Sequence, residues 1–279
     1  MTEKNMMHSK ISSTVGVVVA ALALTVSGCS AGNGSSSTAR TSAAGRTLTV
    51  FAAASMTSTF NELGKTFERE NTGVTVTFDF AGSQALAQQI TNGASADVFA
   101  SANQANMKTV TDAGLASGSA QVYATNTLEI VVPKDNPAGI SSFQDLTKSG
   151  LKLVTCAPSV PCGAATQQVE QTTGITLKPV SQEQAVTDVL TKVRTGEADA
   201  GIVYKTDVLS AGDAVAGIPF PEASRAVNTN YIVSLKNASE AALGEKFVDL
   251  VMSDAGQQVL QNAGFGSPTA TASSASASS

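Results

Sequence analysis

Histidine is almost absent from this chain, whose 279 residues include only His8. Histidine activates serine and cysteine nucleophiles, transfers protons near neutral pH and binds zinc. His8 lies in a leader segment that we expect to be removed, so the mature chain would contain no histidine. The sequence therefore argues against hydrolases of the Ser-His-Asp and Cys-His kinds and against histidine-ligated zinc.

Positive charge is also scarce. Lysine and arginine together number 17 against 22 acidic residues, which gives a formal net charge of -5. A nucleic-acid-binding protein needs a basic surface, so we expect no nucleic acid partner. We also find no Walker-type phosphate loop and no pair of carboxylates placed for glycoside hydrolysis. Because 42% of the residues are hydrophobic, the chain can still bury the core of one large or two ordinary domains.

The first residues are typical of a secretion signal. Lys4 and Lys10 give a positive start, residues 11–26 are apolar, and small residues lead to Cys29. The tetrapeptide Val-Ser-Gly-Cys that ends at Cys29 resembles a bacterial lipobox, which implies a lipoprotein signal peptide over 1–28 and a lipid anchor on Cys29. The alternative is an ordinary cleaved signal in which Cys29 has no role.

Two further segments are poor in apolar residues. Residues 29–45 are rich in Gly, Ser and Ala and predict a flexible tether, and residues 268–279 are of the same kind and predict a disordered tail. The tether and anchor together imply a protein held at the outer face of the cell membrane. The folded part is then about 46–267.

Within the folded part, short apolar runs alternate with segments of helical period. The first three runs (48–52, 74–80 and 97–100) are each followed by a helical pattern, which predicts a parallel sheet covered by helices. A second series begins at residue 128, and its last strand is expected at 231–235. We therefore predict an α/β fold with two lobes, one formed by 46–127 plus 236–267 and the other by 128–235, with a ligand cleft between them.

Candidate binding residues lie where strands give way to helices. Ser55 and Ser83 each follow a strand and small residues, and each precedes a helix. A helix start of this kind exposes N–H groups that can hold an anion without a lysine. Each serine could instead only cap its own helix.

Three more candidate residues lie where a strand gives way to a helix. A proline-containing loop ends at Cys162, a helix begins near Val186, and Tyr204 follows a buried strand. The hydroxyl of Tyr204 could equally be that of an ordinary core tyrosine.

These segments resemble the molybdate-binding protein ModA family. The resemblance spans 48–265 and rests on Phe-Ala-Ala-Ala-Ser at 51–55, Phe-Ala-Gly-Ser at 80–83, Ala-Asp-Val-Phe at 96–99, Ala-Pro-Ser-Val-Pro-Cys-Gly at 157–163 and Gly-Ile-Val-Tyr at 201–204. It implies a two-lobed type II periplasmic binding protein that captures molybdate, and tungstate as well, for the permease of an ABC importer.

The resemblance also implies a ligand set. The oxyanion would be held by Ser55, Ser83 and Tyr204 and by the backbone amides of Cys162 and Val186. The family pattern has alanine in place of Cys162, an exchange that leaves a backbone amide unaffected. No cofactor and no free metal cation is implied, since molybdenum is bound as its oxyanion, and the protein is expected to act as a monomer.

Other functions stay open at this point. The ligand could be another tetrahedral oxyanion such as sulfate, because the sequence does not set the cavity radius. An enzyme on the same fold, a hydrolase or transferase, is a more remote alternative, as is an adhesin or sensor lobe. Asp97 and Asp199 are acidic residues outside the ligand set, and we expect Asp97 to hold a neighbouring turn or the hinge.

Two cysteines remain once Cys29 is lipidated. Cys156 and Cys162 lie six positions apart across the proline-containing loop, in a chain that we expect to face an oxidising environment. They are expected to form a disulfide, and the alternative is a pair of separate buried thiols.

Overall fold

The structure is a computed structural model that describes residues 45–268. The predicted signal peptide, Cys29 and nearly all of the predicted tether and tail lie outside the described residues. Among the described residues, no helix combines the length and the apolar character that a membrane span requires.

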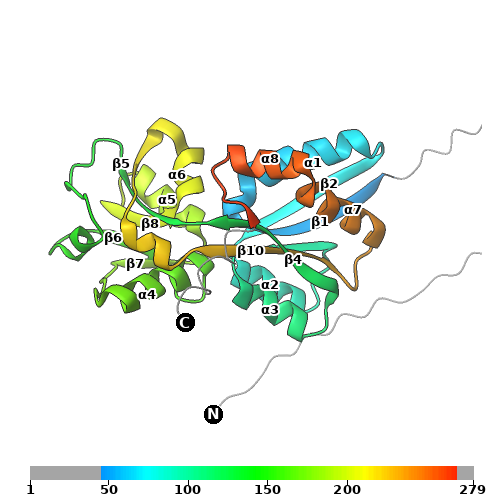
Figure 1. Ribbon diagram of the computed structural model, residues 1–279, viewed down its shortest axis with the longest axis horizontal. Helices are drawn as coiled ribbons and strands as arrows, with labels where there is room; N and C mark the ends of the chain where they lie inside the picture. The colour runs from blue at the N-terminus through cyan, green and yellow to red at the C-terminus, as the bar shows by residue number, and fades with distance from the viewer. Residues whose placement is uncertain (1–44, 269–279) are drawn as a thin grey trace, which may run out of the picture. The chain divides into compact units, whose positions relative to one another are not determined.

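The first lobe is built on a five-stranded sheet (Figure 1). Its strands lie in the order β2-β1-β3-β10-β4, with bounds β1 Arg46–Ala53, β2 Val74–Ala81, β3 Val98–Ser101, β4 Ala116–Asn126 and β10 Asn228–Leu235. Its helices are α1 Thr57–Glu70, α2 Ser83–Thr91, α3 Gln104–Asp112, α7 Ala241–Met252 and α8 Asp254–Asn262. A short 3-10 turn, η1 Ala54–Met56, joins β1 to α1.

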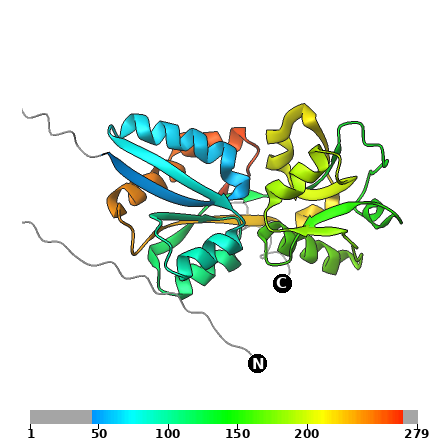
Figure 2. The same cartoon turned by 180° about the vertical axis from the view of Figure 1, so that it is seen from behind.

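Apolar side chains on the two faces of the first sheet form two separate hydrophobic cores. In β1, Val50 packs with Phe60 of α1 and Phe247 of α7, whereas the next residue, Phe51, packs on the opposite face with Leu86 of α2. Successive side chains of a strand point to opposite faces, so α1, α7 and α8 cover one face of the sheet and α2 and α3 cover the other (Figure 2).

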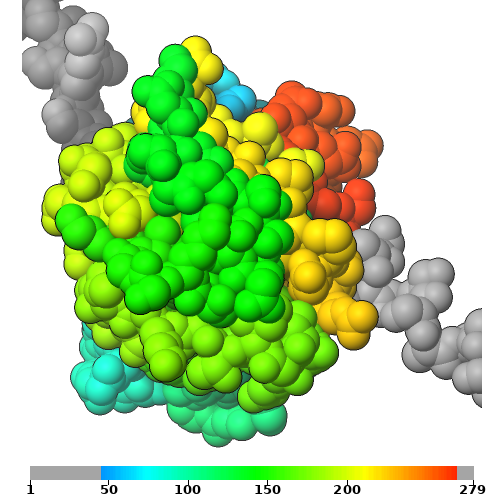
Figure 3. Space-filling model, turned by 90° about the vertical axis from the view of Figure 1, so that its left-hand side faces the viewer, coloured from blue at the N-terminus to red at the C-terminus, as the bar shows by residue number. Residues whose placement is uncertain are grey.

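The second lobe has its own five-stranded sheet and a single core. The strands lie in the order β7-β6-β8-β5-β9, with bounds β5 Leu128–Pro133, β6 Leu153–Cys156, β7 Ser181–Glu183, β8 Ala200–Tyr204 and β9 Val215–Ile218. Its helices are α4 Pro161–Thr173, α5 Val186–Arg194 and α6 Lys205–Ala211, and its 3-10 turns are η2 Gln144–Thr147, η3 Gly212–Ala214 and η4 Pro221–Arg225. The segment between β5 and β6, coloured green, covers much of the outer end of this lobe (Figure 3).

The chain passes between the lobes at two neighbouring places. Thr127 alone separates β4 of the first sheet from β5 of the second, and the return lies between η4 and β10. Asn126 at the end of β4 pairs with Asn228 at the start of β10, so the two connections run side by side. Two adjacent extended connections place little constraint on the angle between the lobes. The hinge between the lobes therefore lies at these two connections.

The predicted boundary of the second lobe at residue 235 is wrong. Strand β10 belongs to the first sheet, where it pairs antiparallel with β3 and β4 and buries Ile232 in the first core. Because β10 runs against β3, the first sheet is mixed and not purely parallel as the alternating pattern predicted. Strand β4 was also missed, because its first half is largely exposed and consists of small residues such as Gly118.

Asp97 fixes the junction of three elements of the first lobe. Its carboxylate accepts hydrogen bonds from the backbone N–H groups of Thr49 in β1, at 2.7 Å, and of Glu240 before α7, at 2.8 Å, and from the hydroxyl of Ser239 at 3.2 Å. The side chain is buried, with 1% of Asp97 exposed. The expectation that Asp97 holds a neighbouring turn agrees with these contacts. Asp199 similarly accepts the N–H of Lys152, at 2.8 Å.

We predict that Asp97→Ala lowers the free energy of unfolding by about 3 kcal/mol, because two partly buried N–H groups lose a charged acceptor. Urea unfolding measures the change. Asp112→Ala is the control, since this exposed carboxylate makes only an i,i+4 pair with Lys108 and its loss should cost less than about 0.5 kcal/mol. Equal effects of the two substitutions would contradict the structural role of Asp97.

Candidate functional site

A small cavity lies between the lobes, and all five residues predicted to bind the ligand line it. Ser55 and Ser83 come from the first lobe, and Cys162, Val186 and Tyr204 come from the second. The remaining lining residues are Ala53, Ala54, Ala81, Gly82, Ala102, Val160 and Pro161. The cavity volume is about 10 Å³, which is room for one small group.

Three helices direct their N-termini at this cavity. Ser83 is the first residue of α2, Cys162 the second of α4 and Val186 the first of α5. The first-turn N–H groups of a helix lack intrahelical acceptors and carry the positive end of the helix dipole. The cavity wall therefore presents several N–H donors and a positive local potential.

The position of these helices follows from the strand order. Strands β1, β2, β6 and β8 all end next to the cavity, and each is followed at once, or after a short loop, by a helix. Ligand sites in α/β folds form at such carboxyl ends of strands. Small side chains such as Ala81 and Gly82 leave the amides accessible.

The structure does not support a capping role for the two serines. Ser55 lies in η1, where Met56 is the N-cap of α1, and Gly82 is the N-cap of α2, with no side-chain cap hydrogen bond in either helix. The Oγ atom of Ser83 accepts the N–H of Ala102, at 3.1 Å, and this leaves its hydrogen available as a donor. Both serines thus lie beside helix starts, but Ser55 lies one residue before the N-cap of α1 and Ser83 one residue after the N-cap of α2.

Two hydroxyl groups at the cavity are buried without a partner. The Oγ atom of Ser55 and the hydroxyl of Tyr204 are inaccessible to solvent and have no hydrogen-bond partner within the part of the chain that the structure describes. Buried polar groups are normally paired, and an unpaired one costs about 1 to 3 kcal/mol. Both atoms line the cavity, so they mark the place where a ligand would supply the missing acceptor.

Tyr204 keeps its proton in this environment. Burial raises the pKa of Tyr204 well above its usual value, and the nearby Asp207 carboxylate raises it further. The phenol is therefore a hydrogen-bond donor at neutral pH. The Asn228 side chain lies near the phenol and offsets part of this rise in pKa, but the hydroxyl makes no hydrogen bond to any of the described residues. An ordinary core tyrosine would have such a partner.

The sequence analysis missed Asp207, a buried acidic residue three positions after Tyr204. Asp207 is buried and accepts the backbone N–H of Tyr204 at 2.9 Å, and burial raises the pKa of its carboxyl to about 7. It does not line the small cavity, whose lining residues are all uncharged. Its three-residue spacing from Tyr204 is the helix-start pattern in which an acidic side chain accepts the N-cap amide, and this pattern could have identified it.

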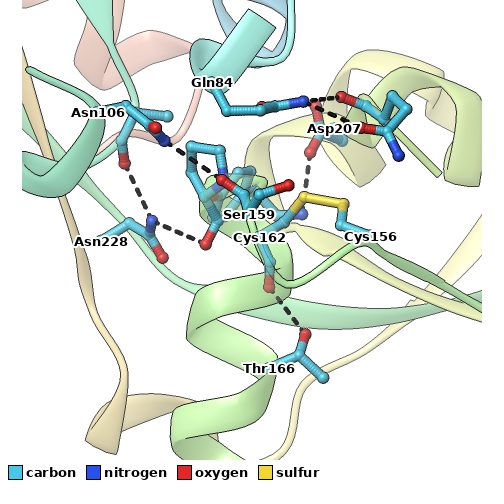
Figure 4. The surroundings of a disulfide bond; sticks show 12 residues. Gln84, Asn106, Cys156, Ser159, Cys162, Thr166, Asp207 and Asn228 are labelled. Atoms are coloured by element: carbon cyan, nitrogen blue, oxygen red, sulfur yellow. Dashed lines mark hydrogen bonds between the residues drawn. A yellow bond between two sulfur atoms is a disulfide. The ribbon is translucent and has the colours of Figure 1, made fainter. Parts of the chain in front are cut away.

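A disulfide holds the loop that precedes α4 (Figure 4). It joins Cys156 at the end of β6 to Cys162 in the first turn of α4, with their Cα atoms 5.8 Å apart. Pro161 occupies the first turn of the helix, where a missing N–H costs nothing. A Cβ at Gly163 would lie 1.9 Å from the carbonyl oxygen of Ala157, so the loop packs directly on the helix start.

The arrangement offers hydrogen-bond donors and no catalytic group. Among residues 45–268, no cluster of three or more histidine, cysteine, aspartate or glutamate side chains could hold a metal ion. The donors are neutral hydroxyl and amide groups that line a small, buried cavity, which suits an anion that is desolvated on binding. Binding of a small oxyanion is the chemistry that this site can perform.

Comparison with known proteins agrees with this geometry. Residues 48–266 match the family described as bacterial extracellular solute-binding proteins. The chain is also 48% identical over 255 residues to the molybdate-binding protein ModA of Mycobacterium bovis, an alignment that covers 91% of this chain and 98% of the relative. This chain belongs to the ModA family. It is an extracytoplasmic solute-binding protein and not an enzyme, as the sequence predicted.

Solved structures share the fold of this ModA-family protein. The periplasmic molybdate-binding protein of Azotobacter vinelandii matches with a TM-score of 0.70 at 23% identity, over 78% of this chain and 98% of that one. The sulfate-binding protein SubI of Mycobacterium tuberculosis matches with a TM-score of 0.65 at 18% identity, over 79% and 86%. The predicted α/β fold of a two-lobed periplasmic binding protein is thus confirmed.

Removal of each of the three side-chain hydroxyls should affect the stability of the protein differently in oxyanion-free buffer. Ser55→Ala and Tyr204→Phe should leave the free energy of unfolding unchanged or raise it by up to about 1 kcal/mol, because each removes a buried polar atom that has no partner. Ser83→Ala should lower it by about 1 to 2 kcal/mol, because the N–H of Ala102 loses its acceptor. Urea unfolding of the three variants beside wild type measures the difference, and a large loss for Tyr204→Phe would show that its hydroxyl is paired.

Proposed function

We propose that this solute-binding protein captures molybdate, and tungstate as well, and delivers it to the permease of an ABC importer. The observation that carries the proposal is the convergence of five neutral donors on one cavity, two of them buried hydroxyls without a partner. The name and 48% identity of the Mycobacterium bovis relative support molybdate as the anion.

The proposed donors divide between the lobes. The hydroxyls of Ser55 and Ser83 would bind from the first lobe, and the amides of Cys162 and Val186 and the phenol of Tyr204 from the second. A tetrahedral oxyanion presents acceptors in four directions, so donors on both sides of a cleft can be paired at once. The molybdenum atom would be surrounded by its own oxygens, and no protein atom would coordinate it.

Neutral donors also select the protonation state of the ligand. A singly protonated anion would place a donor against a wall of donors, and at least one buried hydrogen bond would be left unmade. Fully ionised dianions such as molybdate, tungstate and sulfate avoid this conflict, whereas phosphate keeps a proton at neutral pH. Because this protein is acidic overall, selectivity must arise from the local N–H dipoles and not from its net charge.

Sulfate is the second candidate ligand. It has the same charge and shape as molybdate but is smaller, so the donors would have to move inward to pair with it. The likeness to the sulfate-binding protein SubI extends to the fold alone at 18% identity. We favour molybdate because the relative at 48% identity is a molybdate-binding protein.

We further propose that the protein acts as a monomer anchored to the outer face of the cell membrane through lipid on Cys29. The lipobox-like sequence at residues 26–29 supports the anchor. Two or more acyl chains hold a protein stably at a membrane, whereas one chain binds only marginally. Residues 29–45 would then act as a tether that lets the binding domain reach the permease.

The first test of the proposed function is calorimetric titration of the protein, from residue 30 onward, with molybdate, tungstate, sulfate and phosphate. We expect one-to-one binding of molybdate and tungstate, much tighter than that of sulfate, and no binding of phosphate. Ser55→Ala and Tyr204→Phe should each weaken molybdate binding by about 1.5 to 3 kcal/mol, the range for a hydrogen bond to a charged group.

Ser58→Ala and Tyr231→Phe are the matched controls for this titration, because neither side chain lines the cavity. Both should bind molybdate like wild type. Equal affinities of wild type for sulfate and molybdate would refute the molybdate assignment and favour the sulfate alternative.

The disulfide generates a separate prediction. By the loop-entropy estimate, closing a ring of about seven residues stabilises the fold by about 2 to 2.5 kcal/mol, so reduction should lower the free energy of unfolding by that amount. Reduction should also weaken molybdate binding, because the ring fixes the helix start that presents the Cys162 amide. Thiol labelling of the unfolded, unreduced protein should find no reactive thiol in residues 30–279. Unchanged affinity after reduction would rule out the preorganising role.

A further inference from the structure

Few hydrogen bonds join the lobes beside the cavity. The side-chain Nε2 of Gln84, in α2, donates to the carbonyl oxygen of Gln184, just before α5, at 2.9 Å. Asn106 of α3 donates to the carbonyl of Ser159 at 3.5 Å, a longer bond (Figure 4).

Asn228, at the start of β10, donates to the carbonyl of Pro161 at 3.5 Å, and Asn126, at the end of β4, donates to the hydroxyl of Thr206 in α6 at 2.8 Å. The Asn126 and Asn228 bonds start from the two connections between the lobes, and the Gln84 bond is the shorter of the two that start from a helix of the first lobe.

A close approach of backbone accompanies the Gln84 bond. A Cβ added at Gly82 would lie 2.2 Å from the carbonyl oxygen of Gln184, so the two lobes touch here with no space for a side chain. Gly82 has φ of -60° and ψ of 135°, a conformation that any residue adopts. The contact between the lobes, and not the backbone conformation, therefore requires glycine at this position.

The contact lies directly beside two proposed anion donors. Gly82 precedes Ser83 at the start of α2, and Gln184 lies two residues before Val186 at the start of α5. The Gln84 side chain folds back over Gly82, with its Nε2 atom 2.6 Å from the position of the added Cβ. Its Oε1 atom is buried and has no partner among the described residues, so the bond to Gln184 is made at a cost in desolvation.

We propose that Gly82 and Gln84 form a clasp that holds the lobes closed over the bound anion and sets the rate at which the anion leaves. This inference rests on the proposed function. The clasp joins the N-terminus of α2 to that of α5 and so fixes the spacing between donors from opposite lobes. Because its atoms meet only when the lobes are together, the clasp acts after the anion has entered, and its loss should change dissociation more than association.

Gln84→Ala removes the cross-lobe hydrogen bond without entering the cavity, whose lining does not include Gln84. Stopped-flow displacement of bound molybdate by excess tungstate should show dissociation roughly 3- to 10-fold faster than wild type, with association nearly unchanged, as expected for one neutral hydrogen bond. Gln88→Ala is the matched control, because Gln88 is an exposed glutamine one turn further along α2. It should dissociate like wild type.

Gly82→Ala tests the close approach. Its Cβ should keep the lobes apart, so small-angle scattering in molybdate should give a larger radius of gyration than for wild type, and affinity should fall more than in Gln84→Ala. Gly45→Ala is the control, since a Cβ there meets only an ordinary contact of 3.6 Å with the carbonyl of Gly73. Thermal unfolding of both variants checks that each is folded.

The outcomes separate the clasp from the proposed function. If wild type binds molybdate but Gln84→Ala matches Gln88→Ala in dissociation, or Gly82→Ala is as compact as wild type, the clasp is overturned and the function stands. If wild type binds none of the oxyanions, the proposed function fails. The role of the clasp in anion release then fails as well, and scattering decides only whether Gly82 lets the lobes meet: a larger radius of gyration for Gly82→Ala than for wild type supports this contact, and an equal one overturns it.

Discussion

The first-turn amides of α2, α4 and α5 meet at one small cavity, and these donors have to be paired. Each helix start concentrates partial positive charge, and three of them together would repel one another and remain unsatisfied in a small, buried cavity. The hydroxyls of Ser55 and Tyr204 add two more unpaired groups. An oxyanion relieves all of these costs at once. This requirement explains why an acidic protein needs no lysine or arginine at the cavity.

The division into two lobes makes the site conditional on their relative position. Ser55 and Ser83 belong to the first sheet, and the other three proposed donors belong to the second, so neither lobe carries the full set. Two extended connections beside each other allow the lobes to move as units. Packing within each lobe therefore positions part of the candidate site, and the full set of proposed donors exists only where the two lobes meet. Gly82 of the first lobe contacts Gln184 of the second lobe beside this cavity.

Local sequence patterns predicted most helices and strands but not every partner of each strand. The apolar run at 231–235 identifies a strand, yet the run is equally suited to either sheet, and it was assigned to the second lobe as the last strand of the series that begins at residue 128. Only pairing with β3 and β4 assigns it to the first. The edge strand β4 escaped detection because half of it is exposed and gains its structure from β10, not from burial of its own side chains.

The amino-acid sequence alone was sufficient for the family, for most of the alternation of strands and helices, and for five residues that line one cavity, because each depends on patterns within a few consecutive positions. The ligand role of these five residues remains a proposal. Tertiary structure was needed to show that Ser55 and Tyr204 lack partners, that Asp207 is buried against the Tyr204 amide, and that Gly82 touches Gln184. These properties depend on atoms about a hundred residues apart or on the exclusion of water. No local spacing encodes them, since desolvation and close approach arise only when the packed lobes meet.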